Sequence, residues 1–350
     1  MNKRKAKNLQ VWFEDALGMT TIIAISLLGA VVLSFWLSKT PGKTLHYFFL
    51  GPLQNMYYLG NMLNGAIPLI FGGLGVSLAM KGGTFNLGGE GQIYAGGFVA
   101  TLCALLFEPL GILGAVLALL IGALTAGFLS GLSGYFRMKW NTSEMITSFL
   151  ISNAVLLVIN YLIAGPFMDT STNLIATRKI PEAFRLKAIL QPSNLSSALF
   201  WAILAVVLVQ IYLFKTKSGY ELRLCGNNIN FARYGGIDVR RYEVLPMFLS
   251  GAFYGLGGGM AIFGTYYACI KEFSTGMGWN GLAVALIAKY KPSAVIPAAI
   301  FFSYIESGAR NAMIQSDVTF ELASVVQAFV FFLVSSEVLL HLFHPKGGSR

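Results

Sequence analysis

The chain has 350 residues, of which 55% are hydrophobic and only 11% are charged, and its formal net charge is +10. A water-soluble domain normally has about 25% charged residues, and its apolar residues alternate with polar ones. The composition therefore excludes an ordinary soluble domain and favours a protein that is embedded in a lipid bilayer.

Long charge-free runs follow one another along the chain. Six of them are about 20 residues or longer, which is enough to cross a hydrocarbon core of roughly 30 Å. These six are residues 16–38, 57–80, 110–136, 145–168, 195–214 and 244–270. Four more stretches are shorter or are interrupted by glycine and proline: residues 91–107, 273–288, 292–305 and 322–336. We predict an all-α fold, a polytopic transmembrane helix bundle of about ten spans that includes short and broken helices.

The positions of the basic residues predict which side of the membrane each segment occupies. With ten spans and a cytoplasmic N-terminus, 17 of the 25 Lys and Arg residues lie in cytoplasmic segments, as the positive-inside rule requires. The basic residues of segment 165–197 oppose this rule, but long translocated loops are often exempt from it. We therefore expect a multi-pass protein of a bacterial cytoplasmic (inner) membrane with both termini in the cytoplasm. This topology, and not nucleic-acid binding, accounts for the positive charge, and we expect the lipid membrane and no nucleic acid as a partner.

Two connections are long enough to have a role of their own. The extracytoplasmic loop, residues 165–197, is polar, and we expect it to contain a short helix over residues 181–190. In the cytoplasmic segment, residues 215–243, either Asn227 or Asn228 provides a good helix N-cap, and two glycines at 235–236 provide a good stop. This pattern predicts a short helix over residues 227–234, with an ordinary solvated loop as the alternative.

Glycine is abundant, with 39 residues in the chain, and it clusters inside the predicted spans. Three pairs are spaced by four residues: Gly127 and Gly131, Gly251 and Gly255, and Gly255 and Gly259. This spacing predicts helices whose backbones approach closely. A short echo also links Phe85-Asn-Leu-Gly88 with Phe273-Ser-Thr-Gly276, since each follows a glycine-rich span and precedes an apolar run. We interpret the echo as two pseudo-repeated halves with broken helices at matching positions, which is typical of transporters.

Several polar side chains lie at membrane depth. Burying a carboxylate in lipid is costly, so Glu90, at the edge of a span, must face water, a polar partner or the N-terminus of a half-helix. The functional interpretation is a polar constriction on a substrate route; the structural alternative is that Glu90 and Asn86 cap broken helix ends, and amides at this depth also commonly join helices. The residues that we predict to line the route are Asn64, Phe85, Asn86, Glu90, Gln92, Asn153, Trp279 and Asn280.

The residues offer little support for an enzyme or a metal site. Cys103, Cys225 and Cys269 have no metal-ligand spacing, and the histidines form no HExxH arrangement. The run at residues 41–44, Pro-Gly-Lys-Thr, looks like the end of a phosphate loop, but the first glycine of such a loop would fall at Leu37. No acidic residue lies in the middle of a predicted span, which argues against an ion-coupled secondary transporter.

Four stretches, in the right order, resemble segments of one known family. Residues 82–92, Gly-Gly-Thr-Phe-Asn-Leu-Gly-Gly-Glu-Gly-Gln, resemble its FNIGxEGQ signature, and residues 222–237 resemble its RAVGxNxxAAxYxGI segment. Residues 249–258 are similar to its SGALAGLAG span, and residues 278–287 are similar to its GxxGIAVALL break. The chain is identified as a member of the ABC-transporter permeases that import nucleosides and simple sugars, a branched-chain amino acid-like family. The resemblance extends over about residues 60–305.

This resemblance implies half of an importer, with a single transmembrane permease domain over residues 1–350 that is not an enzyme. Such a system has a second permease subunit, here expected to be a homologous partner in a heterodimer, a cytoplasmic ABC ATPase and a substrate-binding lipoprotein. ATP is then hydrolysed by the ATPase, so this chain needs no cofactor and no metal. The short helix predicted in segment 215–243 becomes the coupling helix that docks on the ATPase. The coupling residues implied in this way are Arg223, Asn227, Asn228, Ala232, Arg233, Tyr234 and Gly235.

One departure from the family pattern bears on the cargo. Residues 142–153 resemble the nucleoside-type NEVITTxMLNY helix, but Ser143 replaces its first Asn and Ser152 stands in place of its last, with Asn153 one residue later. One residue is a rotation of about 100° around a helix, so Asn153 does not simply substitute. We predict import of nucleosides or a related ring-containing nutrient by alternating access. Riboflavin or a simple sugar is the alternative cargo, and an ion-coupled secondary transporter is the alternative from a different class.

Overall fold

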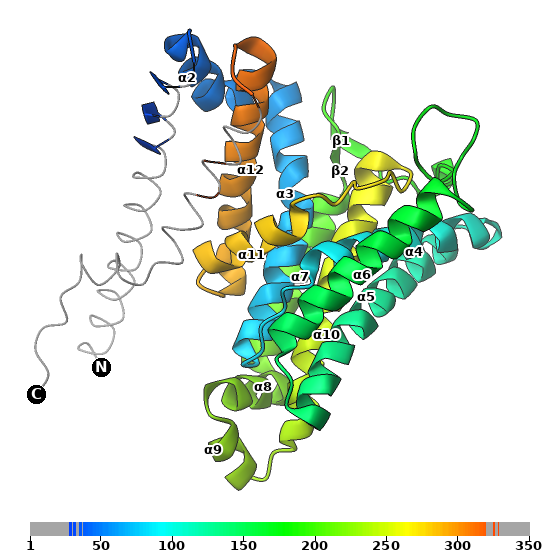
Figure 1. Cartoon of the computed structure of the whole chain (residues 1–350), viewed down its shortest axis with the longest axis vertical. Helices are drawn as coiled ribbons and strands as arrows, with labels where there is room; N and C mark the ends of the chain where they lie inside the picture. Colours follow the sequence, from blue (N-terminus) through cyan, green and yellow to red (C-terminus); the bar gives the residue numbers. More distant parts are fainter. Residues whose placement is uncertain are drawn as a thin grey trace, which may run out of the picture. The chain divides into compact units, whose positions relative to one another are not determined.

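The computed structural model describes residues 38–319 without a break, together with residues 28, 29, 31, 32, 35, 36, 325 and 328 (Figure 1). Most of the first predicted span (16–38) and of the last (322–336) lies outside the described residues. The described helices are α2 (Pro41–Leu50), α3 (Met56–Lys81), α4 (Gly89–Leu106), α5 (Ile112–Trp140), α6 (Glu144–Ala164), α7 (Ala198–Lys215), α8 (Lys217–Asn227), α9 (Ile229–Tyr234), α10 (Val239–Ala261), α11 (Met277–Ile287) and α12 (Pro292–Gln315). Two short strands, β1 (Ala188–Leu190) and β2 (Leu195–Ser196), pair antiparallel. The all-α prediction is confirmed.

Five helices in the described part of the chain are long and apolar enough to cross a membrane. They are α3, α5, α6, α7, and α10 taken together with the π-helical turn Ile262–Tyr266 that extends it. Each coincides with one of the long charge-free runs. Of the shorter predicted spans, two correspond to α4 and α11, and the third is the first part of α12, which continues to Gln315. The count of ten spans stays a prediction.

The described chain divides into two compact units. The smaller unit joins the residues before Gly60 to those from Phe302 onward, and the larger unit is Gly60–Phe301. The larger unit contains α4 to α11 and all the residues predicted for the substrate route and for ATPase coupling.

In the smaller unit, side chains tie the residues around α2 to the end of α12. The hydroxyl of Tyr304 donates to the carbonyl of Phe49 at 2.6 Å. Beyond the end of α12, the carboxylate of Asp317 accepts hydrogen bonds from Ser38 Oγ and from the backbone nitrogen of Lys39, both at 2.6 Å. These hydrogen bonds lower the pKa of Asp317 to about 2, so the carboxylate keeps its charge well below neutral pH.

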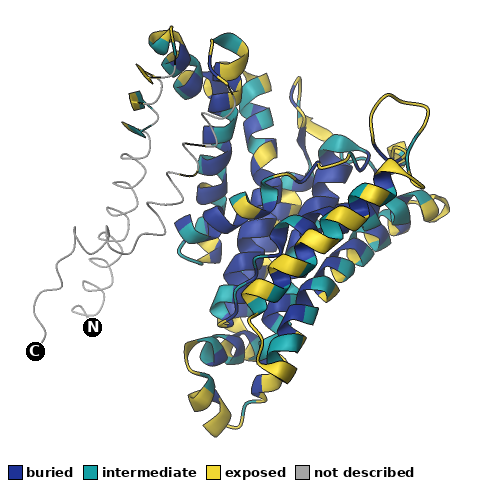
Figure 2. Cartoon of the chain, viewed as in Figure 1, coloured by how far each residue is buried: buried dark blue, intermediate teal, exposed yellow. Residues whose placement is uncertain are grey.

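In the larger unit, α10 packs most extensively on α5 and α4. Burial differs sharply between helices: 89% of the most hydrophobic stretch of α3 is buried and 72% of that of α10, against 22% for α6. The exposed residues of α6 form a continuous stripe along its outer face (Figure 2). α3 and α10 therefore form the core of this unit, and α6 forms part of its surface.

Glycines allow α10 to approach its neighbours closely, as their spacing predicts. A Cβ atom at Gly251 would overlap the carbonyl oxygen of Ala126 in α5, and one at Gly255 would lie 2.6 Å from the Cβ of the same alanine. Gly258 lies equally tightly against the carbonyl of Ile93 in α4. Any side chain at these positions would push the helices apart.

The structure of the predicted outer loop, residues 165–197, differs from the sequence prediction in one respect. The helix expected over residues 181–190 does not form; a single 3₁₀ turn at Glu182–Phe184 is followed by β1. The backbone N–H of Leu186 donates to the carbonyl of Phe263 at 2.8 Å. The loop thus satisfies its backbone through a distant segment and through the β1–β2 pair, and not through a helix of its own.

Candidate functional site

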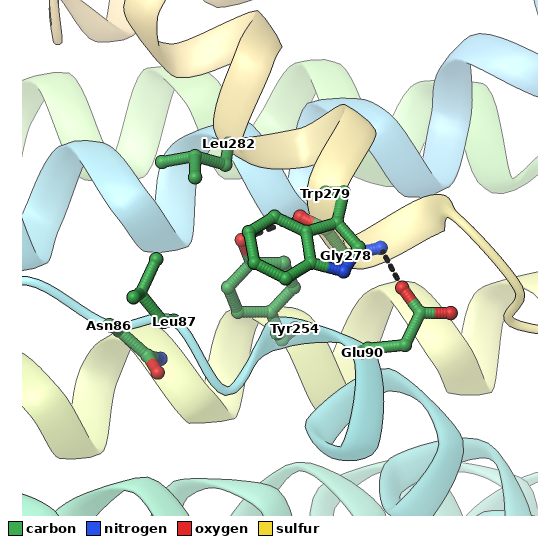
Figure 3. A pocket seen from close by; sticks show the side chains of 8 residues that line it. Asn86, Leu87, Glu90, Tyr254, Gly278, Trp279 and Leu282 are labelled. Atoms are coloured by element: carbon green, nitrogen blue, oxygen red, sulfur yellow. Dashed lines mark hydrogen bonds between the residues drawn. The ribbon is translucent and has the colours of Figure 1, made fainter. Parts of the chain in front are cut away.

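Two breaks between helices meet in the larger unit. The first, residues 82–88, separates α3 from α4, and the second, residues 267–276, separates the π-helical turn from α11. They contain the two echoing sequences, although the internal repeat itself stays a prediction. Their neighbouring helix ends come together at one side chain, Glu90 (Figure 3).

Glu90 is the second residue of α4 and holds the start of α11. Its carboxylate accepts the backbone N–H groups of Gly276 and Gly278, each at 2.9 Å. Because α11 begins at Met277, these are the unpaired donors of its first turn, where a negative charge is favourable. Of the three surroundings that the sequence allows for Glu90, the structure shows the N-terminus of a half-helix.

The contact between α4 and α11 is tight. A Cβ atom at Gly278 would overlap the backbone nitrogen of Glu90, so only glycine permits this approach. The fully buried Tyr254 of α10 donates its hydroxyl to the carbonyl of Gly278 at 3.1 Å. Around them lies a narrow crevice lined by Asn86, Leu87, Gly89, Glu90, Tyr254, Gly278, Trp279 and Leu282 (Figure 3). The crevice has no room for a water molecule.

Asn86 and Gln92 form the polar core of the first break. The Nδ2 of Asn86 donates to Gln92 Oε1 at 2.7 Å, and the Nε2 of Gln92 donates back to Asn86 Oδ1 at 2.9 Å. Asn86 also donates to Ser250 Oγ of α10 at 2.9 Å and accepts the N–H of Gly88 at 2.9 Å. Both side chains are buried, and these hydrogen bonds hold the break in shape, in agreement with the capping alternative.

The inner face of α6 satisfies further N–H groups of the first break and of the first turn of α4. Glu144 Oε1 accepts from Phe85 N at 3.3 Å, Ser148 Oγ from Leu87 N at 3.1 Å, and Ser152 Oγ from Gly91 N at 2.8 Å. The three acceptors are spaced by four residues and therefore lie on one face of the helix. Ser148 and Ser152 were not identified from the sequence. Small polar residues spaced by four in an otherwise apolar helix are the pattern that could have indicated them.

Asn64 lies away from this crevice. Its Nδ2 donates to Thr265 Oγ1 at 2.8 Å, and its Oδ1 accepts from the backbone nitrogen of Ser196 at 3.2 Å. Asn64 thus joins α3 to the π-helical turn and to β2. The structure gives it a helix-joining role, which the sequence left open.

The other predicted route residues lie nearer the surface of the unit. Asn153 is exposed on α6, a turn of about 100° away from the buried Ser152. Trp279, in the first turn of α11, borders the crevice and is 46% exposed, and Asn280 beside it is half-buried. Phe85, at the first break, is also half-buried.

The segment 215–243 folds into α8, α9 and the start of α10. The caps of α9 are those that the sequence predicts: Asn228 Oδ1 accepts the N–H of Phe231 at 3.0 Å, and Gly235 follows the last helical residue. Ala232 is buried, whereas Phe231 is 62% and Tyr234 is 92% exposed. The predicted short helix is confirmed, although it begins two residues later because Asn228 is its cap.

The residues predicted for ATPase coupling do not share one face. Arg223 donates its Nε to the carbonyl of Leu213 at 2.9 Å and so caps the C-terminus of α7. Asn227 ends α8 and lines a cavity of about 260 Å³ together with Arg137 and Tyr242. Asn228, Arg233, Tyr234 and Gly235 are exposed. Sequence reasoning missed Phe231, whose exposed ring lies one turn before Tyr234 on the same helix.

Segment 215–243 also touches the first break. Gly226 of α8 packs on Gly83, so that a Cβ at Gly83 would lie 2.8 Å from the Cα of Gly226. Arg137 of α5 donates to the carbonyl of Gly83 at 3.0 Å and to Glu144 Oε1 at 2.7 Å. One chain of contacts therefore runs from α8 through the first break to α6.

Comparison with known proteins identifies the family. The family model described as the permease component of branched-chain amino acid transport systems matches residues 58–335. The chain belongs to this family. The permease is 34% identical over 320 residues to the probable riboflavin import permease protein RfuC of Treponema pallidum, across 91% of this chain and 84% of that protein.

Two further relatives are named for other transported compounds. The guanosine ABC transporter permease protein NupP of Bacillus subtilis is 32% identical over 302 residues, across 85% of this chain and 86% of that protein. The glucose ABC transporter permease protein TsgB13 of Haloferax volcanii is 28% identical over 342 residues, across 95% of this chain and 90% of that protein. No solved structure matches the permease.

Family membership establishes the class of protein. The permease is a multi-pass inner-membrane subunit of an ABC importer, a transport component and not an enzyme. Permeases of this family work with an ATPase and a substrate-binding protein. The missing phosphate loop and the scarcity of mid-span carboxylates agree with this class, because the energy comes from another subunit.

Proposed function

We propose that this permease imports nucleosides or a related ring-containing nutrient by alternating access. The observation that carries the cargo class is the similarity, over most of the chain, to permeases named for riboflavin and for guanosine. Riboflavin is therefore the nearest alternative to a nucleoside. The similarity to a permease named for glucose keeps a simple sugar as a further candidate.

The narrow crevice at Glu90 supports a gate. α4 and α11 both begin there, and one carboxylate holds the start of α11 against α4. Broken helices in transporters mark the route of the cargo, because their free backbone groups need polar partners within the membrane. Release of the two N–H groups by Glu90 would free α11 to move and would open the crevice.

The exposed rings of α9 support docking of the ATPase there. Large aromatic side chains that are almost fully exposed, such as Tyr234, are typical anchors of protein interfaces. We place segment 215–243 and both termini in the cytoplasm, and loop 165–197 outside. ATP is then hydrolysed by the docked ATPase, with no cofactor in this chain. A homologous second permease and a substrate-binding lipoprotein complete the importer.

Uptake by the complete transporter tests this proposal. The permease is purified with its ATPase, second permease and binding protein, reconstituted in proteoliposomes, and supplied with radiolabelled guanosine, riboflavin or glucose. We expect ATP-dependent accumulation of guanosine or riboflavin that ionophores do not abolish. Accumulation of glucose alone would replace the proposed cargo by a sugar. Uptake that needs an ion gradient and not ATP would contradict the mechanism.

A further inference from the structure

The outer face of α6 carries a stripe of side chains that nothing in the described part of the chain covers. Phe149, Asn153, Leu157 and Tyr161 recur every four residues, and all are exposed. This spacing places them in one line along the helix. The opposite face of α6, with Ser148 and its neighbours, packs on the first break.

Asn153 shows that this stripe does not simply face lipid. It lies near the middle of α6, where an exposed amide in contact with hydrocarbon costs free energy because lipid offers it no hydrogen bond. Its Nδ2 donates to the carbonyl of Phe149 at 2.8 Å, while its Oδ1 accepts no hydrogen bond from the described residues. The side chain is thus half-satisfied and needs a polar neighbour from outside the described residues.

The outer face of α7 provides the contrast. Apart from Lys215 at its end, the exposed residues of α7 are all apolar, among them Trp201 and Leu204. Such a face is suited to hydrocarbon. The difference between the two helices indicates that α7 faces lipid and that the stripe on α6 borders water or another subunit.

An aromatic pair joins this stripe to the gate. The ring of Phe149 lies 6.4 Å from that of Trp279, centroid to centroid, at an angle of 60°. Trp279 directly follows Gly278, whose N–H is held by Glu90, and it is 46% exposed, so part of its indole is free for contact. An aromatic surface next to an unfilled amide acceptor suits a flat heteroaromatic ring, which stacks on the one and hydrogen-bonds to the other.

We infer that Phe149, Trp279 and Asn153 form a contact site for the ring of the cargo on the translocation route. This inference rests on the proposed function, from which it takes the ring-containing cargo. The site lies on the face that the second permease completes, so the route runs along α6 and the start of α11. Because the indole belongs to the first turn of α11, movement of that turn at the gate would also move the ring that the cargo stacks on.

Water access at Asn153 tests the placement of the route. The single variants Asn153→Cys and Leu204→Cys, the second a matched control on α7, are each assembled into the complete transporter and treated with a membrane-impermeant maleimide. The unchanged chain gives the background from its native cysteines. We expect the label at residue 153, in the ATP-free or the vanadate-trapped state, and slower labelling when guanosine or riboflavin is added, with residue 204 at background. If residue 153 stays at background in both states, its face is dry and the inference is wrong.

Transport by ring variants tests the stacking. We expect Trp279→Leu to lower uptake of guanosine or riboflavin about fivefold or more, while Trp279→Phe retains more of the rate because it keeps a ring. Trp201→Leu on α7 is the matched control and should transport as the unchanged chain does. Equal rates for Trp279→Leu and the unchanged chain would contradict the stacking role. If Trp279→Leu does not assemble, Phe149→Leu takes its place with the same expected loss.

These outcomes separate the inference from the proposed function. Should the unchanged transporter move glucose but neither guanosine nor riboflavin, the proposed cargo fails, and the labelling at residue 153 alone decides whether this face lines the route. Should it move guanosine or riboflavin while Trp279→Leu and Phe149→Leu both transport normally, the proposed function stands and the contact site is wrong.

Discussion

Glu90 and Gly278 are 188 residues apart in the sequence, yet the carboxylate of the first accepts the backbone N–H of the second at 2.9 Å. The same carboxylate accepts the N–H of Gly276. α11 is only 11 residues long, and a helix of this length forms few backbone hydrogen bonds of its own. Its start therefore depends on an anion supplied by α4.

Removal of the carboxylate should loosen α11. Glu90→Ala leaves two backbone donors without their charged acceptor, and we expect it to lower the free energy of unfolding by about 2–3 kcal/mol. Glu90→Gln should cost less, because its amide oxygen still accepts a hydrogen bond. Thermal unfolding of the purified permease in detergent measures both, with Glu108→Gln at an exposed turn as the control. Unfolding of Glu90→Ala at the temperature of the unchanged chain would show that the contact contributes nothing.

A methyl group at Gly278 should separate α4 from α11. The added Cβ would overlap the backbone nitrogen of Glu90, and backbone cannot give way as a flexible side chain can. We expect Gly278→Ala to lower the free energy of unfolding by about 1–3 kcal/mol. Gly42→Ala is the control, because nothing lies within 4 Å of a Cβ at that position in α2. It should be neutral or slightly stabilising.

The serines on the inner face of α6 should protect the first break from solvent exchange. Ser148→Ala or Ser152→Ala leaves the N–H of Leu87 or of Gly91 unpaired in a mostly buried setting, at a cost of about 1–3 kcal/mol each. Hydrogen–deuterium exchange should rise over residues 85–91 in both variants. Thr147→Ala is the matched control, since that hydroxyl bonds only within its own helix. Equal protection in all three variants would mean that these hydrogen bonds do not hold the break.

The features that the sequence predicted well are those with local causes. Five of the six longest apolar runs coincide with long apolar helices of the described chain because length and composition suffice, and α9 was predicted because its cap and its stop lie beside it at Asn228 and Gly235. The spaced glycines of α10 predicted close packing because a missing side chain has the same consequence against any partner.

Features with distant causes were not predicted. The sequence required a polar partner or a half-helix for Glu90, but it did not show that the partner is the start of α11. The helix expected over residues 181–190 failed because Leu186 bonds to Phe263, a partner outside its own loop. The amide of Asn64 joins three segments, and the sequence did not show which segments these are. In each case the deciding group is far away in the sequence.

The exposed rings of α9 lead to the last prediction. Tyr234 and Phe231 project from a helix whose one buried residue is Ala232, so truncating either ring removes docking area and little internal packing. If α9 docks on the ATPase, Tyr234→Ala should lower the amount of ATPase that co-purifies by about tenfold, since central aromatic anchors contribute about 1–2 kcal/mol or more. Phe231→Ala should lower it less, because its ring is more covered. Thermal unfolding of both variants should match the unchanged chain, which separates docking from folding.

The matched control for this docking prediction is Tyr220→Ala, which removes an exposed tyrosine from the neighbouring helix α8. We expect it to retain the ATPase, because α8 is tied to the permease itself through Arg223 and through Gly226, and not to an outside partner. Retention by Tyr234→Ala together with loss by Tyr220→Ala would move the docking surface from α9 to α8. Loss by both would widen it to the whole of segment 215–243. Retention of the ATPase by both variants would place its docking surface elsewhere. The contacts that run from α8 to the first break would then not link the ATPase to this break.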